Sequence, residues 1–379
     1  MNANIQSLLK AGHQVKVLAL NTNKYFIKES EIPETYRKQT GIEFIYTDLS
    51  IKPMAAFLNL FSKKSYNIER FITKEIEHKI VEVLKKDVYD IVQLEMLHMT
   101  PYIGTIKEFS EAKIVLRSHN IEHLIWERIT HNTKNPIKKL YLANLTQKLK
   151  NYELENLNAY DGIITITKKD ADFFKANGCT IPLDEVPFGV EVNDYQAGQN
   201  NFEFPSLFHL GAMNWVPNEE GIKWFIDKVW PLFHQKYPNI KFYLAGRMMP
   251  DWLIKLDKPN LEIIGEVPDA KEFIRSKAVM IVPLFSGSGI RIKIIEGMAL
   301  GKAIIATEIG AEGINYTNGK DILIANTPAE YLEAIEKCLA DIEVCHQLGK
   351  NARALIENQH SLEHVVEKLE SFYQRILEN

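Results

Sequence analysis

Residues 283–314 read PLFSGSGIRIKIIEGMALGKAIIATEIGAEGI, and this stretch decides the predicted fold. A buried strand ends at Leu284, a loop with Gly287 and Gly289 follows, and a helical pattern begins near Arg291. Glycines ahead of a helix let backbone N–H groups approach an anion, and the helix N-terminus favours negative charge. The stretch therefore predicts a strand, an anion-binding loop and a helix, which is the building unit of a doubly wound parallel sheet.

The charged residues of this stretch indicate what the loop binds. Arg291 and Lys293 place positive charge at the helix start, and Glu296 lies three residues beyond Lys293 on the same helical face. A carboxylate beside an anion site suits a ligand that also donates hydrogen bonds from hydroxyls, as a ribose does. We therefore expect a site for a nucleotide-diphosphate sugar. The alternative is a solvated helix start with an ordinary Glu–Lys surface pair.

The same alternation of strand and helix runs along the whole chain. Continuous apolar runs such as IVLRS and VMIVPL are typical of strands buried on both faces, as in parallel sheets covered by helices. Strands are predicted at 14–20, 43–49, 90–95, 113–118, 162–167, 185–190, 206–211, 241–246, 261–267, 279–284, 303–307 and 321–325. Helices are predicted at 71–86, 146–158, 221–236, 293–300 and 328–339. The pattern predicts an α/β fold of two Rossmann-like, doubly wound parallel-sheet domains that face each other across a cleft.

A polar segment marks the expected domain boundary. Residues 192–206 read VNDYQAGQNNFEFPS, rich in Asn and Gln, and a new strand begins directly after them. We therefore expect an N-terminal domain over 1–195 and a ligand-binding domain over 206–360. A C-terminal helix over 361–379 is expected to pack back on the N-terminal domain.

Composition excludes several classes of protein. The 379 residues carry a formal charge of −4 and are 46% hydrophobic, which fits an ordinary globular chain and not a nucleic-acid binder. The start of the chain lacks the pattern of a signal peptide, and no apolar run is long enough to cross a membrane. Three scattered cysteines (Cys179, Cys338 and Cys345) fit a reducing compartment, so a cytoplasmic protein is expected.

With these motifs the chain resembles the family four glycosyltransferases, or glycosyl transferases group 1, which have the GT-B fold. The resemblance rests on the helix motif 296–299 (EGMA) and the turn 301–303 (GKA). Further matching segments are FHLGAMNWVPNEEGIKWF (208–225), IKFYLAGR (240–247) and IIGEVPD (263–269), with weaker matches in the first half. The resemblance implies sugar transfer from a nucleotide-diphosphate sugar, with retention of anomeric configuration and without a catalytic metal or other cofactor.

The resemblance also implies roles for single residues. Arg291 and Lys293 would face the diphosphate and stabilise it as it departs, and His119 would lie near the transferred sugar. These three are the expected catalytic residues. The expected donor-binding residues are Glu296 on the ribose, Gly211 at a tight turn, Glu266 and Val267 near the base, Gly287, Ser288 and Gly289 in the glycine-rich loop, and Gly310 near the sugar.

Three departures from the family pattern matter. Ser288 stands where the family usually has a Glu that contacts sugar hydroxyls, and Ala212 and Met213 stand where an Arg is usual. The chain also begins inside the helix that would follow a first strand and a glycine-rich loop. We therefore expect one central strand to be absent from the N-terminal sheet, and a catalytically impaired nucleotide-sugar binder is an alternative function.

Two further alternatives remain open at this stage. His119, Glu122 and His123 fit H-x-x-E-H, the inverted zinc-peptidase signature, in which two histidines on one helical face would bind zinc. His119 directly follows a predicted strand, however, which argues against a helix there. A GT-B-fold sugar-nucleotide epimerase is the other alternative, although no clear set of carboxylates supports it.

Two basic, apolar segments suggest contact with a membrane surface. Residues 128–152 contain six basic side chains and no Asp or Glu, with leucines interleaved, and residues 51–64 read IKPMAAFLNLFSKK. Such segments dock on anionic membranes, although a helix with a core face and a solvated face is the commoner explanation. The expected partners are thus a nucleotide-sugar donor, a glycan or lipid-linked acceptor, and the inner face of the membrane. Cell-envelope polysaccharide biosynthesis would fit them.

Overall fold

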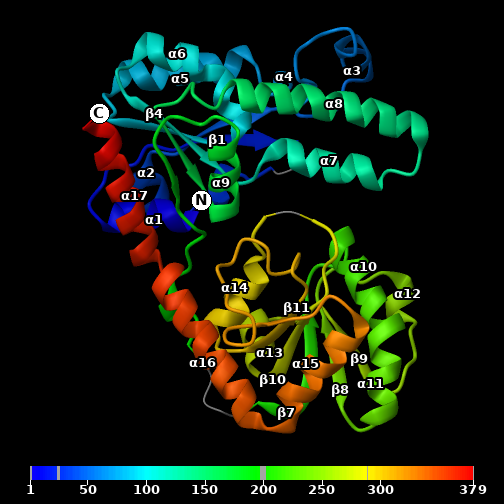
Figure 1. Cartoon of the computed structure of the whole chain (residues 1–379). Coiled ribbons are helices and arrows are strands. Elements are labelled where there is room, and N and C mark those ends of the chain that lie inside the picture. Colours follow the sequence, from blue (N-terminus) through cyan, green and yellow to red (C-terminus); the bar gives the residue numbers. More distant parts are fainter. Residues whose placement is uncertain (1, 24–25, 197–201, 288, 379) are drawn as a thin grey trace. The chain divides into compact units, whose positions relative to one another are not determined.

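The computed structural model describes residues 2–23, 26–196, 202–287 and 289–378, which form two compact units. The N-terminal unit comprises Met1–Pro187 and Val365–Asn379, and the C-terminal unit comprises Phe188–His364. Figure 1 shows the elements of both units in chain order. The division lies at Pro187, ahead of the polar segment, because Phe188, Val192 and Tyr195 pack against the core of the C-terminal unit.

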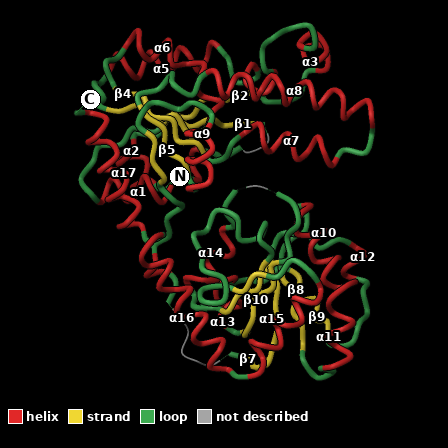
Figure 2. The backbone as a smooth tube through the Cα atoms, in the orientation of Figure 1, coloured by secondary structure: helices red, strands yellow, loops and turns green. Residues whose placement is uncertain are grey.

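The C-terminal unit is built on one six-stranded parallel sheet in the order β12-β11-β10-β7-β8-β9. The first strand of the unit, β7, therefore lies at the centre, and the strand order reverses between β7 and β10 (Figure 2). In such sheets ligands bind where the order reverses, at the carboxyl ends of the strands. The strands are β7 (Glu203–Leu210), β8 (Lys241–Ala245), β9 (Leu261–Gly265), β10 (Lys277–Val282), β11 (Ala303–Ala306) and β12 (Leu323–Ile324).

Helices cover both faces of this sheet, which is why its strands are apolar throughout. Leu207 and Phe208 are neighbours on β7 and belong to two different core clusters, one on each face. Together these two clusters hold β10 and β11 almost entirely out of water. The helices are α10 (Val216–Trp224), α11 (Trp230–Lys236), α12 (Asp251–Ile254), α13 (Ala270–Arg275), α14 (Ile292–Ala299), α15 (Pro328–Ala340) and α16 (Ile342–Gln359), and a π-helical turn (Phe225–Val229) joins α10 to α11.

The described strands of the N-terminal unit form two parallel sheets. One pairs β1 (Leu18–Thr22) with β2 (Glu43–Thr47). The other has the order β3-β4-β5-β6, with β3 (Ile91–Glu95), β4 (Lys113–Ser118), β5 (Gly162–Thr165) and β6 (Leu183–Glu185). No ladder joins the two sheets in the described part of the chain. The expectation that a central strand is absent stays a prediction.

Helices pack on both faces of the four-stranded sheet. On one face, Phe372 and Ile376 of α17 (Leu362–Leu377) pack over β4 and β5. Gly162 allows this approach, because a Cβ there would lie 2.3 Å from the end of Ile376. The other helices are α1 (Asn2–Lys10), α2 (Glu34–Thr40), α3 (Pro53–Asn59), α4 (Tyr66–Glu69), α5 (Lys74–Lys86), α6 (Ile103–Phe109), α7 (Glu122–Asn132), α8 (Pro136–Glu155) and α9 (Lys168–Ala176), with 3-10 turns at Glu29–Glu31, Leu97–Tyr102 and Val192–Asp194.

Two predicted elements differ from the structure in an instructive way. The apolar run 185–190 is not one strand: β6 ends at Glu185, Pro187 cannot donate to a ladder, and Val190 instead bridges Ser361. The helix predicted at 146–158 begins ten residues earlier as α8. Asn135 caps it and Pro136 takes its first position, a start signal that periodicity alone does not register.

Candidate functional site

Loops at the carboxyl ends of the central strands bring most of the predicted residues of the C-terminal unit together. Gly211 follows β7, the glycine-rich loop follows β10 and leads into α14, and Gly310 follows β11. Because β7 and β10 are neighbours where the strand order reverses, their loops lie side by side. Among the predicted residues, Ser288 lies outside those that the structure describes.

The centre of this edge is the ammonium group of Lys293. Its Nζ donates to Asn218 Oδ1 at 2.6 Å and lies 3.4 Å from His209 Nε2. The Asn218 amide is held in turn by a bond from Nδ2 to the Ala212 carbonyl at 2.9 Å. Among the described residues, both hydrogen-bond partners of the ammonium are therefore uncharged groups, one near the end of β7 and one at the start of α10.

Burial and the nearby Arg291 charge lower the pKa of Lys293. Burial, helped by the Arg291 guanidinium, lowers the pKa of Lys293 to about 7. Burial also lowers the pKa of His209 well below its usual value, so that this imidazole is neutral at neutral pH. His209 Nδ1 donates to the Ile281 carbonyl at 2.7 Å, which leaves Nε2 as an acceptor toward the lysine. The cluster can thus bind a proton and an anion together.

The glycines around Lys293 are required by space or by backbone conformation. A Cβ on Gly211 would lie 2.9 Å from Lys293 Nζ and 2.8 Å from Asn218 Nδ2, so any side chain there would displace the ammonium or its partner. Gly287 and Gly289 have φ of 100° and 78°, values that other residues rarely adopt. A Cβ on Gly287 would also approach Trp215 to 3.0 Å.

Arg291 caps α14 and supplies a second cation. Its side chain is 5% exposed, and NH1 donates to the Gly289 carbonyl within the glycine-rich loop. The guanidinium also lies over the Trp215 ring, 5.4 Å from the ring centre. Arg291 therefore joins the loop, the start of α14 and the start of α10 into one positively charged corner.

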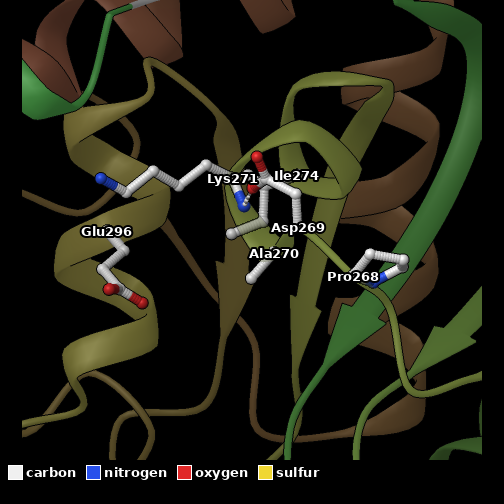
Figure 3. Close-up of a pocket in the computed structure, with 6 residues that line it drawn as sticks. All are labelled: Pro268, Asp269, Ala270, Lys271, Ile274 and Glu296. Atoms are coloured by element: carbon white, nitrogen blue, oxygen red, sulfur yellow. Dashed lines mark hydrogen bonds between the residues drawn. The ribbon is translucent and has the colours of Figure 1, made fainter.

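Glu296 lies less than one turn along α14 from Lys293 and faces an open pocket of about 440 Å³. Figure 3 shows its carboxylate on α14 on one side of this pocket, with the segment that begins α13 on the other. The remaining lining residues are Pro268, Asp269, Ala270, Lys271 and Ile274. Tyr195 contacts the same carboxylate, with its hydroxyl donating to Oε1 at 2.9 Å.

The other predicted donor-binding residues lie close by in the chain. Glu266 and Val267 follow directly after β9, in the loop that leads to the pocket-lining Pro268 and Asp269, but they do not line the pocket themselves. The Gly310 backbone N–H donates to the Thr307 side-chain Oγ1 at 2.9 Å in a turn after β11. A Cβ on Gly310 would lie 2.9 Å from the Val282 carbonyl, which fixes this turn against β10.

His119 belongs to the N-terminal unit and follows β4. Its Nε2 lies 2.5 Å from Glu95 Oε2. Burial raises the pKa of this carboxylate, but the hydrogen bond with His119 and the charge of Arg117 outweigh burial and hold the pKa below its usual value. Gln93 donates to Glu95 Oε1 at 2.7 Å, and the Tyr373 hydroxyl of α17 donates to Gln93 at 2.5 Å. A chain of hydrogen bonds thus holds the His119 ring through Nε2, and Nδ1 has no hydrogen-bond partner among the residues that the structure describes.

The structure does not support the zinc-peptidase arrangement. The helix α7 begins at Glu122, so His119 precedes it and does not share a helical face with His123. His123 is fully buried, with Nδ1 2.6 Å from Glu153 Oε2, whereas His119 is paired with Glu95. No group of three or more His, Cys, Asp or Glu suited to a metal occurs among the described residues.

Several residues of the site were not predicted from the sequence. His209 and Asn218 lie in the quoted segment 208–225, but nothing in that segment indicates that they would meet a lysine 75 to 84 residues further on. Tyr195 lies in the polar segment expected to mark the domain boundary, and Glu95 ends the predicted strand 90–95 without having been assigned a role in a site. Strand order would have been the informative signal, because it places the loops after β7 and β10 together.

Comparisons with known proteins relate the chain to one family and one fold. Residues 204–341 match the family model described as glycosyl transferases group 1. The chain is 20% identical to a protein of the cps region of Klebsiella pneumoniae over 292 residues, 74% of each chain. It is 24% identical to the capsular polysaccharide biosynthesis glycosyltransferase CapM of Staphylococcus aureus, over 50% of this chain and 53% of CapM. The structure of Anabaena HepE in complex with UDP and glucose superposes with a TM-score of 0.64 at 14% identity, over 98% of this chain and 94% of HepE.

The buried pair of Glu122 and Glu153 yields a prediction about stability. Burial and the Glu153 charge raise the pKa of Glu122 to about 7, well above its value of about 4.3 in an unfolded chain. The folded state therefore binds the extra proton, and stability is lost as pH rises from about 4.5 to 7. Glu122→Gln, a neutral isostere, should flatten this decline and stabilise the protein at pH 8 by on the order of 1–3 kcal/mol.

Urea unfolding at a series of pH values measures this effect. Glu127→Gln, which changes an exposed carboxylate on the same helix, is the matched control and should keep the wild-type slope. Equal pH dependence in the wild type and in Glu122→Gln would contradict the assignment.

Proposed function

We propose that this chain, a GT-B protein whose residues 204–341 belong to the glycosyl transferases group 1, transfers a sugar from a nucleotide-diphosphate sugar. One observation carries the proposal: the partly buried Lys293 ammonium has only uncharged hydrogen-bond partners among the residues that the structure describes, and it lies at the start of α14 beside Gly211. A buried cation is costly unless an anion accompanies it, and a diphosphate supplies that anion.

In this proposal the C-terminal unit activates the leaving group. Lys293, Arg291 and the N–H groups at the start of α14 would stabilise the negative charge that grows on the diphosphate as the sugar departs. Glu296, just under one turn further, would accept hydrogen bonds from the ribose hydroxyls in the pocket. By resemblance, the transfer retains the anomeric configuration and uses no metal ion.

His119 supplies the proposed contribution of the N-terminal unit. With Nε2 directed to Glu95, the ring presents Nδ1 to a ligand. A sugar hydroxyl suits this nitrogen, because a hydroxyl can both donate and accept a hydrogen bond. His119 would thus orient the transferred sugar without attacking it.

The acceptor is proposed to be a glycan or a lipid-linked sugar of the cell envelope. CapM is named for capsular polysaccharide biosynthesis, and the match to the protein of the cps region points the same way. The structure adds an apolar surface on the N-terminal unit, in which Met54, Phe57, Leu58 and Phe61 are each more than half exposed on and after α3.

Basic residues accompany this surface. Ile137 and Leu140 of α8 are 81% and 75% exposed, and Lys134, Lys138 and Lys139 lie in the same stretch of chain. Apolar side chains among lysines are suited to an anionic bilayer interface. We place the protein at the cytoplasmic face of a membrane on this basis. No described helix is both long enough and apolar enough to cross a bilayer.

A nucleotide-sugar binder without turnover is the second candidate function. The observation that favours it is the division of the described N-terminal strands into two sheets, because the loops that would contact the sugar rest on that framework. Binding without transfer in the experiment below would select this candidate. Measurable transfer to an added glycan or lipid-linked acceptor would exclude it.

Glu296→Gln tests the donor site. A screen of UDP-, GDP- and ADP-sugars by thermal stabilisation identifies the donor, since a ligand at about 100 times its Kd adds about 2.7 kcal/mol. Glu296→Gln should then weaken binding of that donor about 10- to 150-fold, because hydrogen bonds to a charged acceptor contribute about 1.5–3 kcal/mol. Turnover with an acceptor is followed as release of nucleoside diphosphate.

Glu333→Gln, which changes an exposed carboxylate on α15, is the control and should bind the donor like the wild type. The donor-site assignment fails if Glu296→Gln and Glu333→Gln bind the donor equally well, or if no nucleotide sugar stabilises the protein.

Vesicle binding tests the membrane surface. Sedimentation with anionic vesicles should exceed that with neutral vesicles and fall as salt rises, at about 1 kcal/mol for each engaged Lys or Arg. Lys138→Glu/Lys139→Glu should weaken the salt-dependent part. Phe57→Ser/Phe61→Ser should weaken binding at every salt concentration, since it removes apolar area.

Lys320→Glu/Lys350→Glu carries the same charge reversal on the C-terminal unit and should bind like the wild type. The proposed surface would be refuted if the protein bound anionic and neutral vesicles equally well. It would also be refuted if Lys138→Glu/Lys139→Glu and Lys320→Glu/Lys350→Glu weakened binding equally.

A further inference from the structure

Tyr195 belongs to the polar segment 192–206 and contacts the proposed donor site. Its hydroxyl donates to Glu296 Oε1 at 2.9 Å, and the Lys271 ammonium lies over its ring, 4.2 Å from the ring centre. Burial, together with the Glu296 charge, raises the pKa of Tyr195 above its usual value. The hydroxyl therefore stays protonated and remains a donor to the carboxylate.

Two helices of the C-terminal unit hold the backbone around Tyr195. Arg353 of α16 donates through NH1 to the Tyr195 carbonyl and, at 2.6 Å, to the Ala299 carbonyl at the end of α14. On α13, Lys271 Nζ donates to the Asp194 carbonyl at 3.1 Å, and Arg275 Nε donates to the Gln196 carbonyl at 3.0 Å. The phenol is thus fixed against Glu296 by contacts that do not involve its own hydroxyl.

The position of Tyr195 leaves the pocket open. Glu296 and Lys271 both line the pocket, whereas Tyr195 does not. The hydroxyl therefore holds one carboxylate oxygen from outside the pocket, and Oε2 remains for a ligand inside it. A carboxylate fixed at one oxygen loses rotational freedom before the ligand arrives, which lowers the entropic cost of binding.

We propose that Tyr195 is a positioning residue for nucleoside recognition, which orients Glu296 toward the hydroxyls of a ribose. This proposal rests on the proposed function, because it takes Glu296 as the ribose-binding group. It assigns a role in the donor site to a segment that the sequence indicated only as a domain boundary. The chemistry recognised is the vicinal diol of a nucleoside diphosphate, and the base plays no part.

The test compares ribose with dideoxyribose. The probes are UDP and GDP, each measured by calorimetry against its 2′,3′-dideoxy form. The wild type should bind the ribose form of the preferred nucleotide at least tenfold more tightly. Tyr195→Phe should reduce this ratio three- to tenfold and leave the affinity for the dideoxy form unchanged, because only the diol contact is weakened.

Two further variants complete the comparison. Glu296→Gln should abolish most of the ratio, and adding Tyr195→Phe to it should cause no further loss, since the tyrosine acts through the carboxylate. Tyr316→Phe, at a partly buried tyrosine that packs against the same core cluster, is the control and should keep the wild-type ratio.

The outcomes separate this inference from the proposed function. Suppose that Tyr195→Phe keeps the wild-type ratio of ribose to dideoxyribose affinity while Glu296→Gln loses it. This result would overturn the inference, and the proposed donor site would remain supported. Equal losses for the ribose and dideoxy forms in Tyr195→Phe would also overturn it, because they indicate a purely structural role. An unchanged ratio in Glu296→Gln would overturn both proposals.

Discussion

The partly buried ammonium of Lys293 is the constraint around which the C-terminal unit is arranged. An ammonium with little access to water needs an anion or several acceptors, and here it has an amide oxygen and a neutral imidazole nitrogen. Gly211 leaves room for it, and Arg291 adds a second cation at the same corner. These groups lie at the end of β7, in the loops after β7 and β10, and at the starts of α10 and α14, beside the point where the strand order reverses. The order of the strands thus determines which groups meet at the proposed binding site.

The N-terminal unit shows a similar dependence of a single side chain on distant elements. His119 is held by Glu95 of β3, and the chain of bonds continues through Gln93 to Tyr373 of α17. The last helix of the chain therefore supports a residue at the end of a strand more than 250 positions earlier. A change in the packing of α17 on β5 would alter the orientation of His119 without touching it.

The sequence predicted the strands and helices better than it predicted which of them lie side by side in the fold. Alternating apolar runs and periodic segments identified the strands and most helices, because burial on both sheet faces leaves a strong pattern. Arg291, Lys293 and Glu296 were recognisable because they lie within one helical turn or so. His209, Asn218 and Tyr195 were not, since their importance comes from strand order and from a segment that folds back on α13, α14 and α16. Glu95 was missed for the same reason, because only the pairing of β3 with β4 brings it to His119.

The ionisation of Lys293 tests the central claim most directly. Nuclear magnetic resonance of the lysine side chains can follow the titration of Lys293 between pH 5 and 11. The Lys293 signal is assigned as the one that is missing from the spectrum of Lys293→Arg. The account predicts a pKa near 7 in the free protein, which rises toward the ordinary lysine value of about 10.4 when the preferred nucleoside diphosphate is bound. An ordinary pKa in the free protein, or a pKa that the nucleotide leaves unchanged, would contradict it.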